Sequence, residues 1–198
     1  PVILQLSGTD IYQYLAEDYQ DALRTYDRFI GLYPSEAAGY NNKALVYKRL
    51  GEYRKEEGLY REALAIEPLD ETALNNLAVN LAHQGRYDEA DPLYRRALDL
   101  RLAELGPQST EVAASYNSLA ILNWNRGTFV EAERLYLEAL AIWEAAYGQD
   151  HADVAKGLNN LALLYQATGR YAQAEPLFER AIAIGEKTLG PEHPTIAI

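Results

Sequence analysis

The sequence predicts an all-α solenoid of antiparallel helix hairpins, and three observations support this prediction. A short signature recurs along the chain, each copy leads to a glycine after a fixed interval, and small and aromatic residues follow that glycine at helical spacing. Repeats of 20 to 50 residues are typical of units that bury a continuous core by stacking. The signature occupies Tyr40–Ala44, Leu74–Ala78, Tyr116–Ala120 and Leu158–Ala162, at intervals of first 34 and then 42 residues.

Each repeat is expected to contain two helices that meet at its glycine. Glycine can take the left-handed conformation that ends a first helix. After it come an aromatic residue, a small residue, a second aromatic and an alanine, as in Tyr87, Ala90, Tyr94 and Ala97. Their spacings of three and four place these side chains on one stripe of a second helix. The joining glycines are Gly51, Gly85, Gly127 and Gly169.

The change of spacing from 34 to 42 residues predicts second helices of two lengths. Long second helices are expected over Tyr87–Leu105, Phe129–Tyr147 and Tyr171–Leu189. Eight extra residues would lengthen each of them by about two turns at 3.6 residues per turn. Pro92 and Pro176 lie near the starts of two of these helices, where a missing amide donor costs little.

The pattern decays upstream of residue 35. Tyr19–Pro34 still fits a second helix, but Ser7–Asp10 replaces the first-helix signature and Glu17 replaces the turn glycine. We therefore expect a degenerate terminal repeat with a short first helix over Ile11–Ala16. Edge repeats of solenoids are commonly atypical because one face has no neighbour.

The signature, the turn glycine and the closing proline of Ala63–Pro68 resemble the tetratricopeptide repeat. The 42-residue units, with Leu105–Pro107 and Leu189–Pro194 in their linkers, are similar to those of kinesin light chains. The resemblance implies a right-handed superhelical array. Its expected divisions are a degenerate repeat at 1–34, a repeat at 35–68, long repeats at 69–110, 111–152 and 153–190, and the start of a truncated repeat at 191–198. Because the chain has no methionine, we expect it to be a fragment.

Composition excludes several classes of partner. A net charge of -11 disfavours nucleic acid and anionic membrane surfaces, both of which attract basic proteins. No apolar run approaches the roughly 20 residues that cross a bilayer, and no signal peptide is recognisable. The absence of cysteine removes thiolate chemistry and disulfides. We expect a cytoplasmic protein that has no cofactor and no membrane insertion.

The chain offers little for catalysis. His151 and His193 are equivalent linker residues 42 positions apart, so capping of helix ends explains them better than an active site. His83 stands alone on a first helix and could line a binding surface. Phosphate loops, metal-ligand clusters and nucleophile elbows are not found among the motifs. We expect no enzymatic activity.

The resemblance implies that first helices line a concave, peptide-binding groove. Residues three and four positions apart on these helices form what we call the first-helix stripe. Its members are Asn41, Asn42, Leu45, Lys48, Asn75, Asn76, Val79, His83, Asn117, Ile121, Trp124, Asn159, Asn160, Leu163 and Gln166. Trp124 could act as a binding hot spot or pack between helices.

Asparagines recur on this stripe although asparagine is a middling helix former. The first rung is Asn41, Asn75, Asn117 and Asn159, and the second rung is Asn42, Asn76, Ser118 and Asn160. An amide can donate to and accept from an extended peptide backbone whatever its sequence. The resemblance implies this role for the second rung, with Ser118 the weaker match. The alternative is that one rung bonds neighbouring helices and stabilises the stack.

Charge distinguishes the two helices of each repeat. First-helix segments contain Lys and Arg but no Asp or Glu over Ala37–Leu50, Thr72–Arg86, Val112–Arg126 and Val154–Arg170. A neutral-to-basic groove would attract a partner with acidic as well as hydrophobic residues. Lys43 and Glu56 replace the usual leucine and small residue of one hairpin. We expect them to form a compensating ion pair, since a buried unpaired charge is costly.

Three functions are compatible with these features. The first is a scaffold or adaptor that binds an extended peptide or partner protein in its groove. The second is a structural subunit that self-associates or joins a larger complex through repeat stacking or its convex face. The third is the sensor arm of a larger regulator or enzyme. Repeats alone do not name the partner.

Overall fold

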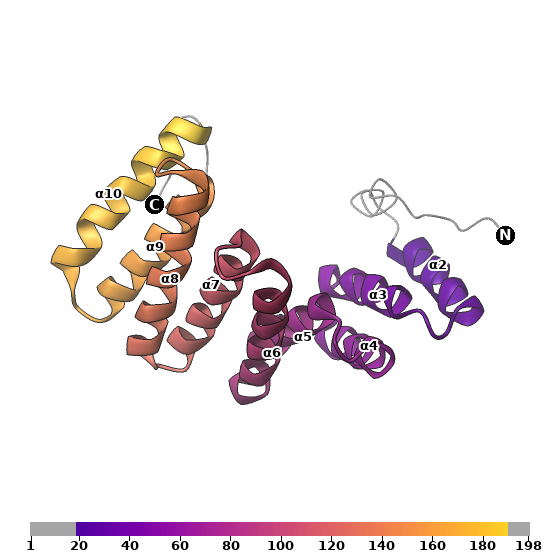
Figure 1. The fold of residues 1–198 in the computed structure, drawn as a ribbon. Coiled ribbons are helices and arrows are strands. Elements are labelled where there is room, and N and C mark those ends of the chain that lie inside the picture. Colours follow the sequence, from indigo (N-terminus) through magenta and orange to yellow (C-terminus); the bar gives the residue numbers. More distant parts are fainter. Residues whose placement is uncertain (1–18, 190–198) are drawn as a thin grey trace. The chain divides into compact units, whose positions relative to one another are not determined.

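A computed structural model describes residues 19–189, and every helix or strand in this range is an α-helix (Figure 1). Sequential packing confirms the all-α hairpin architecture. The helices are α2 (Tyr19–Leu32), α3 (Ala37–Arg49), α4 (Tyr53–Ile66), α5 (Glu71–His83), α6 (Tyr87–Leu105), α7 (Thr110–Asn125), α8 (Phe129–Tyr147), α9 (Ala152–Ala167) and α10 (Tyr171–Leu189).

The described residues form two compact units, which are considered separately. Unit 1 extends to Arg86 and contains α2 to α5, whereas unit 2 begins at Tyr87 and contains α6 to α10. The boundary therefore falls at the turn between α5 and α6. First helices are α3, α5, α7 and α9, and the remaining helices are second helices.

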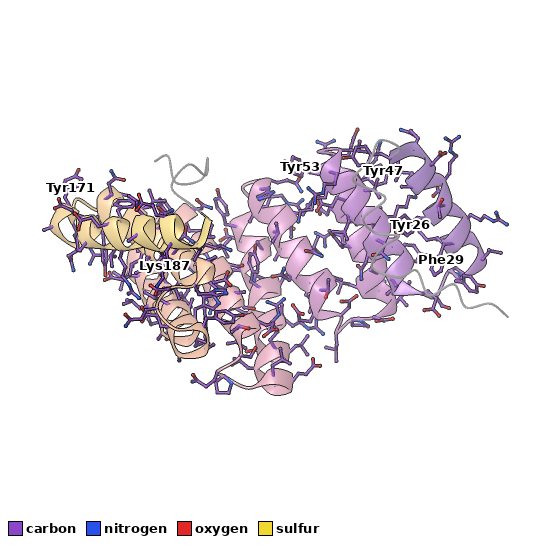
Figure 2. All side chains as sticks on the ribbon, turned by 90° about the horizontal axis from the view of Figure 1, so that it is seen from above. Tyr26, Phe29, Tyr47, Tyr53, Tyr171 and Lys187 are labelled. Atoms are coloured by element: carbon purple, nitrogen blue, oxygen red, sulfur yellow. The ribbon has the colours of Figure 1, made fainter. Side chains whose placement is uncertain are left out.

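Small and aromatic side chains of the second helices form much of the core, as their spacing predicts. Tyr60 and Ala63 of α4 and Ala132 and Tyr136 of α8 are completely buried. A smaller cluster in unit 1 joins Tyr26 of α2 to α3, where Tyr47 packs against it (Figure 2). Burying each large apolar side chain contributes about 1.5 to 3 kcal/mol before chain entropy is considered.

The four repeat glycines end the first helices in the left-handed conformation, which confirms their predicted role. Their φ angles are 71° to 78°. In each turn the amide three residues beyond the end of the helix bonds back to a helical carbonyl, as Arg86 N does to Leu81 O at 2.9 Å and Arg170 N to Tyr165 O at 2.8 Å. This six-residue closure satisfies carbonyls that the helix end leaves free.

The eight extra residues of the long repeats are shared between two helices, and the expectation that they all extend the second helix is wrong. The long second helices have 19 residues against 14 in α4, a gain of five. The first helices α7 and α9 have 16 residues against 13 in α3 and α5, a gain of three. The repeat at 69–110 is the exception, because its first helix, α5, has 13 residues while its second helix, α6, has 19.

The predicted second helix of the terminal repeat is present as α2. The predicted helix at Ile11–Ala16, His193 and the segment 191–198 lie outside the described residues. In the described part of the chain, no helix combines the length and apolar character required to cross a membrane. Tyr171 and Lys187 lie near the two ends of the last helix, α10 (Figure 2).

Candidate functional site

The first-helix stripe is distributed over α3 and α5 in unit 1 and over α7 and α9 in unit 2. Nearly all of its side chains are half-buried or exposed. Leu45 is 37% exposed and Ile121 is 38% exposed, and His83 and Gln166 are exposed as well. Asn117 differs, because it is only 3% exposed, and so it does not present its side chain to a partner.

The amides of unit 1 fall into two groups. Asn41 donates from Nδ2 to Oδ2 of Asp70 at 2.5 Å. Asp70 is the N-cap of α5, and its Oδ1 accepts from the amide of Ala73 at 3.0 Å. Asn42 and Asn76 are half-buried and form no side-chain hydrogen bond within the described residues. The second rung of unit 1 therefore has half-buried amides without a protein partner, beside Asn41, which contacts the N-cap of α5 and whose Oδ1 is buried without a hydrogen bond.

The second rung of unit 2 is occupied by contacts within the protein. Asn160 donates from Nδ2 to Oδ1 of Asn117 at 2.9 Å, which joins α9 to α7. Ser118 donates its hydroxyl to the carbonyl of Ala114 one turn earlier at 3.0 Å. Asn160 therefore bonds a neighbouring helix and stabilises the stack of repeats. This is the alternative to peptide binding that the sequence left open for this rung.

The expected ion pair between Lys43 and Glu56 is wrong. Lys43 contacts Asp27 of α2 instead, with 2.6 Å between Nζ and Oδ1. Glu56 is 1% exposed and accepts from Nδ2 of Asn80 on α5 at 2.7 Å. The two side chains thus reach neighbouring helices on opposite sides of their hairpin.

A buried polar network surrounds Glu56. Burial raises the pKa of its carboxyl, and this outweighs the hydrogen bond from Asn80 and the charge of Lys48, which both lower it. Asn80 also donates to the carbonyl of Tyr53 at 3.0 Å and accepts from Gln84 Nε2 at 2.6 Å. Sequence reasoning missed Asn80, although the signal existed: it is a polar residue among the buried leucines of α5.

The arginines at the ends of the first helices are not free cations. Arg86 pairs with Glu57 at 2.5 Å and Arg170 with Glu133 at 2.7 Å. Arg126 pairs with two carboxylates of α6. Its Nη1 lies 3.7 Å from Oδ1 of Asp91, and its Nη2 lies 3.0 Å from Oδ1 of Asp88. The acceptors Glu57, Asp91 and Glu133 are each the fifth residue of a second helix.

These pairs change the interpretation of the acid-free first helices. Burial would raise the pKa of Glu57, but hydrogen bonds from Arg86, Arg61 and Gln84 lower it overall. Hydrogen bonds from Arg170 and Tyr165 likewise lower the pKa of Glu133. Carboxylates of the preceding second helix therefore neutralise much of the basic charge that the sequence attributes to the groove.

The histidines have structural surroundings. His151 caps α9, as predicted, because its Nδ1 accepts from the amide of Asp153 at 3.2 Å. Its ring also stacks on Tyr147 with 4.0 Å between centroids. His83 meets the ring of Tyr53 edge-on at 6.2 Å. Among the described residues, no group of three His, Cys, Asp or Glu side chains could hold a metal ion.

The fold and this stripe define an α-helical repeat protein. The model of the tetratricopeptide repeat family matches residues 69–145, 119–187 and 153–198, which together make up more than half of the chain. The chain belongs to the tetratricopeptide repeat family, whose members commonly serve as scaffolds for protein–protein interactions. A second model, that of the coatomer epsilon subunit, matches residues 3–106. Proteins with curated functions gave no match.

Solved structures with the same fold include kinesin-light-chain-like proteins. BtubC (BKLC) from P. vanneervenii is 28% identical at a TM-score of 0.71, over 80% of this chain and 66% of BtubC. This chain therefore spans just under two thirds of that protein. A kinesin-light-chain-like protein of Podospora anserina with nearly identical repeats is 23% identical, with a TM-score of 0.73 and coverage of 86% of this chain and 88% of that protein. YrrB, a protein with an unusual peptide-binding site, is 20% identical, with a TM-score of 0.64 and coverage of 89% and 83%.

Proposed function

We propose that this protein is a scaffold or adaptor that binds an extended segment of a partner protein along its first-helix stripe. The observation that carries the proposal is the pair of half-buried, unbonded amides at Asn42 and Asn76, at the same position of successive repeats. The polar atoms of these amides are not among the buried atoms that lack a hydrogen bond, so they are open to solvent and available to a ligand. An extended main chain supplies both the donors and the acceptors that such amides require.

The neighbouring side chains fit the same use. Leu45 and Val79 lie on the stripe beside these amides and are partly exposed, so they can contact apolar atoms of a bound segment. Lys48 is half-buried and has no ion-pair partner among the described residues, although its charge acts on Glu56. An acidic residue in the partner would therefore be favoured near Lys48 rather than along the whole groove.

The similarity to YrrB, a tetratricopeptide repeat protein with a peptide-binding site, supports this class of ligand. The test is selection from a random library of 12-residue peptides, displayed on phage, against the immobilised protein. We expect enrichment that Asn42→Ala with Asn76→Ala removes, because the main-chain hydrogen bonds are lost. A matched control is Gln173→Ala, an exposed residue of the second helix α10. Equal enrichment by both variants would contradict the proposal.

A second candidate function is that of a subunit in a larger assembly. The match of residues 3–106 to the coatomer epsilon subunit, a component of a complex, favours it. Light scattering over a wide concentration range tests self-association directly. If the measured mass is that of a monomer at every concentration, self-association is excluded. This second function would then require assembly with other proteins.

A further inference from the structure

The turn between α3 and α4 is the most basic of the four turns that join a first helix to its second helix. Residues 49–55 contain three cations, Arg49, Arg54 and Lys55, and one carboxylate, Glu52. The equivalent residues of the other turns, 83–89, 125–131 and 167–173, each contain a single arginine, no lysine and at most two carboxylates. Since the whole chain has a net charge of -11, this positive turn lies on an otherwise acidic protein.

We define the basic turn as Arg49, Leu50, Tyr53, Arg54 and Lys55, all of which are exposed. Leu50 is 39% exposed and Tyr53 is 42% exposed. Within the described residues, Arg49 and Arg54 form no ion pair. Nζ of Lys55 lies 3.7 Å from Oε2 of Glu52, and because more than half of each side chain is exposed, this pair contributes little. All three cations are therefore available to a partner.

The ion pair that neutralises other turns is missing here. Arg86 pairs with Glu57, the fifth residue of the preceding second helix, and an equivalent contact recurs in unit 2. The fifth residue of α2 is Leu23, which is buried, and Glu52 occupies the place of Arg86 in the turn. Helix α2 thus supplies no carboxylate at this position, and the basic turn keeps its positive charge.

Arg54 and Lys55 stand where the dipole of α4 disfavours cations. They are the second and third residues of the helix, and the amino end of a helix carries partial positive charge. The equivalent residues of α6 are Asp88 and Glu89, whose negative charges suit that end. The two cations therefore do not serve the stability of α4, which favours a contact with another molecule as their use.

Contacts with an aromatic ring restrain Lys55. Its Nζ lies 5.2 Å from the centroid of the Tyr47 ring, and Nζ of Lys43 lies 6.0 Å from the same centroid. Tyr47 packs against the buried cluster that contains Tyr26, so the core of unit 1 holds this ring in place. A restrained ammonium loses less conformational entropy on meeting a carboxylate than a freely rotating one does. The basic turn is thus partly organised before a partner binds.

We propose that the basic turn binds an acidic segment of a partner protein. Asp and Glu residues of the segment contact Arg49, Arg54 and Lys55, and an aliphatic residue between them contacts Leu50 and Tyr53. The site lies at one edge of unit 1 and does not include the first-helix stripe, so it is a second interaction surface beyond the proposed function. The net negative charge of the protein does not prevent this contact, because charges farther away than about 8 Å are largely screened at physiological salt.

An acidic protein segment fits this surface better than a nucleic acid does. Three cations neutralise few phosphates, and the carboxylates elsewhere on the chain repel the rest of a strand. A single-stranded nucleic acid would need a basic groove that follows its backbone over several nucleotides. A short acidic segment needs only the few charges that the basic turn supplies.

The test is fluorescence anisotropy with a rhodamine-labelled 12-residue peptide that has six Asp or Glu residues around a central leucine. We expect the wild type to bind it in 50 mM NaCl and about tenfold more weakly in 300 mM NaCl, because exposed charges are screened. Arg54→Asp with Lys55→Glu places the residues of α6 at these positions, so the protein should fold without a lower melting temperature. This variant should lose at least about tenfold in affinity, which a merely structural role of the two cations would not produce at unchanged stability.

A matched control is Arg24→Asp with Arg28→Glu, which changes the net charge equally on exposed residues of α2. Its affinity for the acidic peptide should stay within about threefold of the wild type, since both residues lie outside the basic turn. If Arg54→Asp with Lys55→Glu fails to fold, Arg49→Gln with Arg54→Gln removes two of the three cations without adding a carboxylate. That second variant should weaken binding by about fivefold.

Four results would overturn the proposal. They are absence of binding by the wild type, equal losses in the variant and the control, equally tight binding of a peptide with Lys in place of Asp and Glu, and tighter binding of a 12-nucleotide single-stranded DNA.

Asn42→Ala with Asn76→Ala separates this proposal from the proposed function. That variant should bind the acidic peptide as the wild type does, because both asparagines lie outside the basic turn. If it loses the acidic peptide while Arg54→Asp with Lys55→Glu keeps it, the peptide lies on the first-helix stripe. This result would overturn the role of the basic turn and leave the proposed function standing, whereas a failed library selection with intact binding of the acidic peptide would do the reverse.

Discussion

At the scale of single residues, Glu56 shows how one departure from the repeat pattern is accommodated. The equivalent residues Ala90 and Ala132 are fully buried alanines, and Ala174 is nearly so. Among the described residues, Glu56 is the only acid buried to this extent. Asn80 satisfies one carboxylate oxygen, whereas Oε1 is buried without a hydrogen bond. Burial therefore raises the pKa of this carboxyl in the folded protein.

Glu56→Gln should stabilise unit 1 at pH 8, because glutamine occupies the buried site without a charge. The raised pKa means that the folded state binds a proton more tightly than the unfolded state. Wild-type stability is thus greatest below the ordinary pKa of 4.5 and falls as the pH rises toward the folded value. The advantage of the glutamine variant should shrink toward pH 5.

The measurement is amide hydrogen exchange in α4 and α5 at pH 5 and pH 8, with rates corrected for their intrinsic pH dependence. Glu57→Gln is an informative control because its neighbours lower its pKa, so the sign of the pH dependence should reverse. An identical advantage of Glu56→Gln at both pH values would show that burial of the charge is not the cause.

At the scale of helices, side-chain N-caps mark the starts of three of the four first helices, and α3 has none. Asp70, Ser109 and His151 each accept a hydrogen bond from the first turn of the following helix. The residue type differs in each case, but an acceptor atom is present in all three. A buried helix end without such a partner would leave amide donors unsatisfied.

His151→Ala should lower the stability of unit 2 by about 0.5 to 1 kcal/mol through loss of the cap and of the stacking on Tyr147. His151→Ser should recover part of this loss, because a serine hydroxyl can accept the same hydrogen bond. Thermal unfolding followed by circular dichroism measures the difference. If the serine variant is as unstable as the alanine variant, the loss of stability comes from the imidazole ring stacked on Tyr147 and not from the cap.

At the scale of the whole molecule, each unit is tied together by ion pairs between successive repeats. Glu57 and Arg86 form this tie in unit 1, and Glu133 and Arg170 form it in unit 2. Arg170 also lies 4.1 Å from the ring of Tyr165, which itself donates to Glu133 at 2.9 Å. These contacts supplement the apolar core, in which most of the stabilisation resides.

Arg170→Gln should destabilise unit 2 at low salt more than Arg134→Gln does, and the difference should shrink in 1 M NaCl, where charges are screened. Arg134→Gln is a matched control, since the ion pairs of Arg134 among the described residues lie within its own helix, with Glu131 and Glu138, and it should cost about 0.3 to 0.5 kcal/mol. Tryptophan fluorescence during urea unfolding reports on this unit, because both tryptophans of the chain, Trp124 and Trp143, lie in it. Equal costs for both variants would refute the inter-repeat role.

The sequence by itself determined the repeat, the helices, the turn glycines and the cap at His151. These features depend on local periodicity and backbone preference, which a single hairpin already expresses. Tertiary structure decided the partners of the polar side chains. Lys43 and Glu56 share a hairpin yet bond to different neighbours, and Asn76 and Asn160 share a repeat position yet only one is bound. Such choices depend on which donors and acceptors of neighbouring helices lie within hydrogen-bonding reach, and local sequence does not give those distances.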